Sequence, residues 1–277
     1  MRVQDLLDQA SQLPSIPKLV LELLRALDDP NADTGAIAAK VQLDQALSAK
    51  VLRLANSSLY GGIRKVSSVN EAVSLLGVDA LRTMVTASGV TAAFVPPATF
   101  DLKAFWRDSF MVAGLCRWTV RRGKLRQLRA ETAFTAGLIH DIGNLLVHTL
   151  DGERMHDVDA AVAAGAPRGD TERMILGHTS VEIGGALARH WQFPDVLCDA
   201  VVDHVAPMAA KVPNEYAGVV HVARAMHLLL LGRRPVERLF ESAAAPVASW
   251  LELDPELLAE HWDEAASLGS DMAALLD

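Results

Sequence analysis

Apolar residues in almost every segment of this 277-residue chain recur at the spacing of an α-helix. Val20, Leu24 and Leu27 would form one apolar stripe on a helix, and residues 47–54 repeat the pattern. No stretch alternates apolar and polar residues between hairpin turns, which is the pattern of a half-buried strand. The sequence therefore predicts an all-α fold.

Polar caps and glycine mark the ends of several predicted helices. Asp33 or Thr34 can cap a short helix, and Ser68 followed by Glu71 is a capping-box pattern. That second helix should stop at Gly77, since glycine commonly ends a helix.

The segment FVPPATFD, residues 94–101, is the clearest break in the chain, because consecutive prolines cannot continue a helix. It divides an N-terminal helical half from a C-terminal one. In the second half we expect helices over 103–122, 128–150, 154–164, 171–191, 194–205, 214–231 and 235–244, with short ones after Pro255.

Charge and hydropathy narrow the classes of partner. The chain has 26 basic and 34 acidic residues, a net charge of −8, which argues against nucleic acid and anionic lipid as partners. No secretory leader and no membrane-spanning run is evident, so we expect a cytoplasmic location and no membrane contact. Cys116 and Cys198 lack a paired-cysteine motif and should be small buried side chains.

The segment AGLIHDIGNLLV places His140 and Asp141 inside an apolar run. Such a pair can be a hydrogen-bonded structural feature, or it can bind a metal when other helices supply further ligands. His178 and His204 are two candidates for such ligands. Imidazole and carboxylate together would favour iron, manganese or zinc.

Several motifs in order resemble the HDOD domain family. These are LPSIPKL, LDQALSAKVLRLANSSLYG and VSSVNEAVSLLGVDALRTMV in the first half, then FWRDS, AGLIHDIGNLL, GHTSVEIGGALARHW and VVHVARAM. The resemblance implies a multi-helical HDOD fold over residues 8–231. An N-terminal helical lobe (about 1–95) would pack on an HD-like lobe (about 101–231), followed by a C-terminal helical extension (232–277).

The resemblance also implies a degenerate site. HDOD domains are similar to the HD metal-dependent phosphohydrolases, whose pattern needs a histidine, the His-Asp pair and a later aspartate. Here those positions fall on Asp108, His140, Asp141 and Arg224. A guanidinium cannot donate a lone pair to a metal, so no catalytic residue and no cofactor is expected. We hypothesise that Arg224 instead forms an ion pair with Asp141 or Asp108.

HDOD domains are generally taken to be bacterial signalling or regulatory modules. We therefore expect a non-catalytic protein that binds a signalling partner, with a small nucleotide as a further candidate ligand. The alternative is a metal-dependent phosphohydrolase acting on a nucleotide or cyclic dinucleotide through Asp108, His140, Asp141 and either His178 or His204. Against it, the chain lacks the Gly-Tyr-Pro stretch of the related HD-GYP phosphodiesterases, and has Asn144 where they have lysine.

Two further patterns have plain structural readings. Residues 71–85 have the helix-glycine-helix shape of a DNA-reading motif, but an αα-hairpin is a sufficient explanation. The basic segment RRGKLRQLR, residues 121–129, could bind an anionic nucleotide or an acidic protein partner, but a solvated connection between helices is the favoured interpretation.

Overall fold

The structure, a computed structural model, describes residues 14–28, 33–56, 65–98 and 100–273. Every regular element in these ranges is a helix, which confirms the all-α prediction. The predicted domain start at residue 8 and the SSLYG end of the second motif lie outside the described residues. The helices are α2 (Lys18–Asp28), α3 (Thr34–Val41), α4 (Gln45–Ala55), α5 (Val69–Ala92), α6 (Leu102–Arg122), α7 (Ala130–Ile139), α8 (Ile142–Leu150), α9 (Gly152–Ala163), α10 (Arg168–Leu176), α11 (Ser180–His190), α12 (Asp195–Asp203), α13 (Glu215–Leu231), α14 (Ala245–Trp250), α15 (Pro255–Glu260) and α16 (Trp262–Ala273), with 3₁₀ turns η1 (Pro207–Ala209) and η2 (Val236–Glu241).

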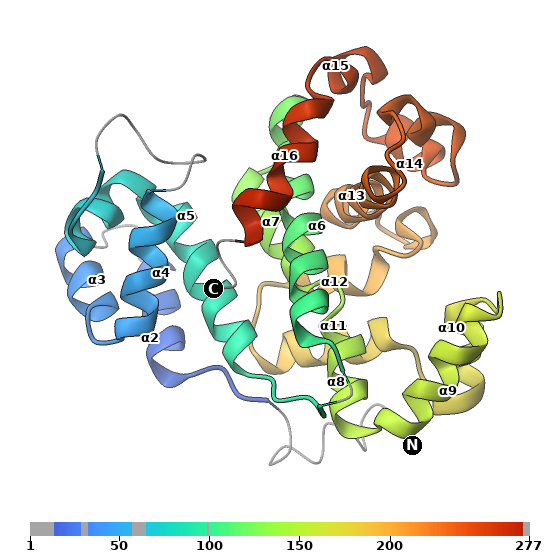
Figure 1. Ribbon diagram of the computed structural model, residues 1–277, viewed down its shortest axis with the longest axis horizontal. Helices are drawn as coiled ribbons and strands as arrows, with labels where there is room; N and C mark the ends of the chain where they lie inside the picture. Colours follow the sequence, from blue (N-terminus) through green and yellow to red (C-terminus); the bar gives the residue numbers. More distant parts are fainter. Residues whose placement is uncertain (1–13, 29–32, 57–64, 99, 274–277) are drawn as a thin grey trace.

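The N-terminal lobe consists of α2, α3 and α4 packed against α5 (Figure 1). Asp33 caps α3 by accepting a hydrogen bond from the backbone of Gly35, and Ser68 caps α5 by accepting one from Glu71, both as predicted. Gly77 has φ of 74° and ψ of 171°, a conformation that glycine adopts at low cost, and it kinks α5. The predicted stop at Gly77 is therefore confirmed, because this non-helical residue separates two helical stretches that α5 joins across the kink.

The second half of α5 connects the two lobes because it also packs on α7 (Figure 1). By length and composition α5 is the one helix in the described part of the chain that could cross a membrane, with 61% of its apolar window buried in the protein. A core helix passes the same test, so this observation carries little weight.

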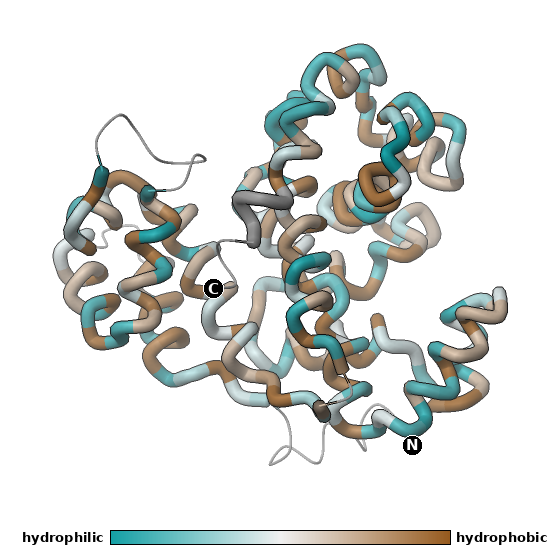
Figure 2. Tube along the Cα trace, in the orientation of Figure 1, coloured by the Kyte–Doolittle hydropathy of each residue, from teal (hydrophilic) through white to brown (hydrophobic). Residues whose placement is uncertain are grey.

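The second lobe is built around the antiparallel pair α6 and α7, onto which α13 packs. Helices α8, α11 and α12 complete this core, and α9 and α10 form a hairpin beside it. The C-terminal helix α16 returns to α6, where the rings of Trp118 and Trp262 lie 6.1 Å apart. Apolar stretches run through helices of both lobes in Figure 2, as the helical periodicity of the sequence requires.

Two predicted helices are each divided in the structure. The predicted helix 128–150 breaks at His140 and Asp141, between α7 and α8. The predicted helix 171–191 breaks where Gly177 adopts φ of 85°, after which Thr179 and Glu182 form a capping box that begins α11. The signals of this second break, a glycine followed by a Thr-x-x-Glu pattern, are present in the sequence and were missed.

Close packing of two glycines fixes α8 against α11. A Cβ added to Gly143 would lie 1.9 Å from the carbonyl oxygen of Ser180 and 2.5 Å from the backbone nitrogen of Gly184. Any side chain at this position would therefore clash with backbone. The glycine of the HDIG segment lets α8 approach α11 and thereby holds the His-Asp break in place.

Candidate functional site

A cavity of about 790 Å³ lies between α6, the α7–α8 break and α13, and we call it the HD-like cavity. It brings together all four residues of the predicted degenerate site, which are Asp108, His140, Asp141 and Arg224. Other polar side chains that line it are Asp101, Ser109, Asn144, His148, Asp159, Arg168, His221, His227 and Ser242. The aromatic residues Phe100 and Phe105 lie on its α6 side.

His140 is buried at the α7–α8 break. Its Nδ1 lies 2.7 Å from the carbonyl oxygen of Gly137, and because a carbonyl can only accept, this nitrogen carries the proton. Burial lowers the pKa of His140 to about 4; the charge of Asp141 opposes this effect and that of Arg224 adds to it. The neutral ring therefore keeps its lone pair on Nε2, the form in which histidine can accept a hydrogen bond or bind a metal.

His204 lies against His140 with ring centroids 5.2 Å apart. Its Nδ1 donates to the carbonyl oxygen of Val201 at 2.8 Å, and burial holds its pKa well below the ordinary value. The ring packs behind His140 and is not part of the cavity lining. Two adjacent neutral rings are thus buried without charge repulsion.

The two carboxylates at ligand positions already have partners in the protein. Asp141 accepts a hydrogen bond from Nδ2 of Asn144 at 3.0 Å. Asp108 lies 3.7 Å from Nε of Arg107 and 3.6 Å from Nε2 of His227. Burial lowers the pKa of His227, and the charge of Asp108 partly opposes that effect.

The hypothesised ion pair of Arg224 is not observed. Arg224 is exposed, lines the HD-like cavity, and has no ion pair with Asp108, Asp141 or any other residue in the described ranges. The apolar residues on either side of it in the sequence suggested burial. In α13 they face the core, while position 224 faces the cavity.

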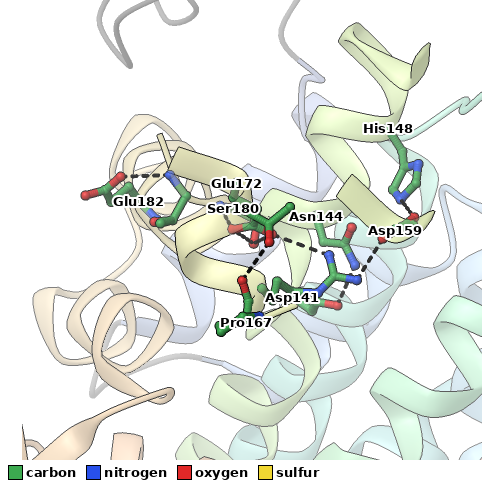
Figure 3. A network of polar contacts seen from close by, with 11 residues as sticks. Asp141, Asn144, His148, Asp159, Pro167, Glu172, Ser180 and Glu182 are labelled. Carbon is green, nitrogen blue, oxygen red and sulfur yellow. Dashed lines mark hydrogen bonds and ion pairs between the residues drawn. The ribbon is translucent and has the colours of Figure 1, made fainter. Parts of the chain in front are cut away.

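A second polar network borders the cavity beside Asp141 (Figure 3). Arg168 donates to Asp159 at 2.7 Å and lies 3.4 Å from the buried carboxylate of Glu172. Glu172 also accepts from the backbone nitrogen and the hydroxyl of Ser180, at 2.8 and 2.9 Å. His148 of α8 joins this network, since its Nε2 lies 3.2 Å from the carboxylate of Asp159.

His178 does not belong to the cavity lining. It lies between α10 and α11, where burial lowers its pKa and its Nδ1 has no hydrogen-bond partner in the described structure. In the described ranges no group of three or more His, Cys, Asp or Glu side chains is arranged to hold a metal ion.

The residues that sequence reasoning missed come from helices distant in sequence. His221 and His227 lie three residues before and three residues after the predicted Arg224 on α13, a spacing that keeps them on neighbouring faces and could have indicated a shared surface. Asp159 and Arg168 enter from α9 and α10, and no local pattern signals their approach.

The basic segment 121–129 is largely engaged in ion pairs. Arg121 contacts Glu131 at 3.0 Å, Arg122 makes two hydrogen bonds to Glu264, and Arg129 pairs with Asp79. This arrangement agrees with a connection between helices.

Comparison with known proteins places this architecture in a family. The HDOD domain model matches residues 13–207. Along 98% of both chains, the structure superposes with a TM-score of 0.84 and 32% identity on a protein from Shewanella amazonensis SB2B named "Putative phosphohydrolase". An HDOD domain protein of unknown function from Geobacter sulfurreducens superposes with a TM-score of 0.80 and 24% identity, covering 99% of this chain and 96% of that one. An uncharacterized protein of Treponema pallidum is 25% identical over 240 residues, which are 84% of this chain and 45% of that protein, so the chain spans less than half of this relative. The chain belongs to the HDOD domain family.

Proposed function

We propose that this protein is a regulatory module that acts by contact with a signalling protein and does not catalyse phosphoester hydrolysis. The observation that carries the proposal is Arg224, a permanent cation exposed to the HD-like cavity at the position where the HD pattern needs a carboxylate. A divalent ion placed among Asp108, His140 and Asp141 would be repelled by it.

The partners of the two carboxylates support the same proposal. Asn144 donates to Asp141, and Asp108 lies between Arg107 and His227. A carboxylate that binds a metal would have to give up or share these contacts. These contacts support a site that needs no metal, in which the polar side chains would hold α6, α8 and α13 in one arrangement.

A metal-dependent phosphohydrolase is the second candidate, favoured by one observation. His140 has its proton on Nδ1, so the lone pair of Nε2 is available, as it is in metal-binding histidines. A metal bound there would activate water for attack on a phosphoester.

Metal loading and hydrolysis distinguish the two. The protein is incubated with Mn²⁺, Fe²⁺ or Zn²⁺, desalted, analysed for metal by mass spectrometry, and assayed with bis(p-nitrophenyl) phosphate. An Asp141→Ala variant is the control. We expect no stoichiometric metal and no hydrolysis above that control, whereas one retained metal per chain with hydrolysis that the control lacks would establish the enzyme.

A further inference from the structure

A second cavity, of about 450 Å³, lies between the two lobes, and we call it the interlobe cavity. Its walls are α2 and the kinked half of α5 from the N-terminal lobe, the first turns of α7, and the connection between α11 and α12. It shares no lining residue with the HD-like cavity. Its volume is within the range of small-molecule sites.

The charges at this cavity are unbalanced toward positive. Among the described residues, Arg25, Arg82 and Arg129 line it together with the carboxylates Asp79 and Glu131. Asp79 is already paired with Arg129. Arg82 donates a hydrogen bond to the carbonyl oxygen of Leu27. Among the described residues the lining thus has three guanidinium groups and two carboxylates, in a chain whose net charge is −8.

Glu131 adds little negative charge to the cavity. It lies 3.0 Å from Arg121 and 3.7 Å from Arg117, and it accepts a hydrogen bond from Thr83. Arg25, in contrast, is exposed and makes no hydrogen bond or ion pair in the described part of the chain. Both carboxylates of the lining are therefore paired with arginines, whereas Arg25 has no counterion in the described structure.

The rest of the lining is apolar and partly aromatic. Trp191 and Phe193 form an aromatic wall at the connection between α11 and α12, where their rings pack edge to face with centroids 6.0 Å apart. Leu21 and Leu24 of α2 and Val196 of α12 add apolar surface to the lining. The wall is firm, because Trp191 is buried and its indole N–H donates to the carbonyl oxygen of Pro14 at 2.9 Å. A rigid aromatic surface beside guanidinium groups suits a ligand with a flat apolar body and an anionic group.

We propose that the interlobe cavity binds a small organic anion, a carboxylate or phosphate attached to an apolar body. The anionic group would lie near Arg25, Arg82 and Arg129, and the body on the wall formed by Trp191 and Phe193. Since these arginines belong to both lobes, the ligand would link α2 and α5 to α7. Binding of the ligand does not depend on the proposed function. The idea that this ligand regulates the protein does rest on the proposed function.

Calorimetric titration with four probes tests the site. Phenyl phosphate and benzoate each have an aromatic ring and an anionic group, phenol has the ring without the anionic group, and inorganic phosphate is an anion without the ring. At least one of the two anionic probes, phenyl phosphate or benzoate, should bind with a stoichiometry of one per chain. Phenol and inorganic phosphate should each have an affinity that is lower by about tenfold or more. The anionic probe with the higher affinity shows whether the site prefers a phosphate or a carboxylate.

Two exposed substitutions locate the probe. Arg25→Gln should weaken binding about fivefold or more, and Val196→Glu should abolish it by placing a carboxylate in the lining. The matched control is Arg126→Gln, which removes an exposed arginine outside the cavity and should change affinity by less than about twofold.

The proposal is overturned if no anionic probe binds saturably, if phenol binds as well as the anions, or if Arg25→Gln and Val196→Glu leave the affinity unchanged. It is also overturned if Asp141→Ala removes binding, since the probe would then occupy the HD-like cavity. None of these results depends on metal content or hydrolysis, so failure here is distinguishable from failure of the proposed function.

Discussion

Replacement of Gly143 by alanine should be among the most damaging single changes in the second lobe. The added Cβ would lie 1.9 Å from the carbonyl oxygen of Ser180, whereas ordinary van der Waals contact begins at 3.4 Å. Helices α8 and α11 would have to separate by about 1.5 Å, because backbone on both sides cannot rotate away. Neighbouring Leu145, Ile183 and Leu187 are fully buried and would lose contact.

Overpacking of a well-packed core costs about 1 to 3 kcal/mol, and a backbone clash places this variant near 3 kcal/mol. The measurement is urea unfolding at pH 7, followed by circular dichroism. Gly169→Ala is the matched control: an added Cβ at Gly169 in α10 has no neighbour within 4 Å, so this variant should gain about 0.5 to 1 kcal/mol. A free energy of unfolding for Gly143→Ala within about 0.5 kcal/mol of wild type would refute the packing argument.

Three other perturbations have defined outcomes. Arg224→Ala should change the free energy of unfolding by less than about 0.5 kcal/mol, since the side chain is exposed and without an ion pair in the described structure, and a loss above about 2 kcal/mol would reveal a pair. Acid should destabilise the fold, because the pKa of His140 is about 4 in the folded protein and about 6.5 in the unfolded chain, which therefore takes up the proton more readily. The contribution of His140 to the free energy of unfolding is complete above pH 6.5 and is lower by about 2 kcal/mol at pH 5. Urea midpoints at pH 7.5 and 5 test this, and equal midpoints would contradict it. Lys124→Gly should stabilise by about 0.5 to 1 kcal/mol, because Lys124 has φ of 56° after α6, and a thermal melt that shows no gain would count against that strain.

The helices and their caps could be predicted because their causes are local. Asp33 and Ser68 cap the helices that follow them, and Gly77 interrupts α5, since each acts through its own backbone neighbours. The break at His140 and Asp141 has no glycine or proline to announce it. It depends on the contact of α8 with α11, which local sequence does not encode.

The members of the degenerate site could be predicted, but their electrostatic relations could not. The motif resemblance selected Asp108, His140, Asp141 and Arg224, and all four line one cavity. The ion pair expected of Arg224 is absent in the described structure because the side chain faces the cavity. Asp141 instead accepts a hydrogen bond from Asn144, and the half-exposed Asp108 lies 3.6 Å from His227. Which polar groups pair with each other depends on distances in the folded protein, and the spacing of residues along the sequence does not determine these distances.

We propose that Asp108 and Arg224, which stand where the HD pattern has a histidine and an aspartate, remove the metal site. Metal affinity of the wild type and of the double variant Asp108→His with Arg224→Asp, measured by titration with Mn²⁺, Fe²⁺ and Zn²⁺, tests it most directly. We expect no measurable metal site in the wild type and one site per chain in the double variant, because the double variant has two histidines and two aspartates at the four HD positions. A wild-type protein that binds one metal as tightly as the double variant would contradict it.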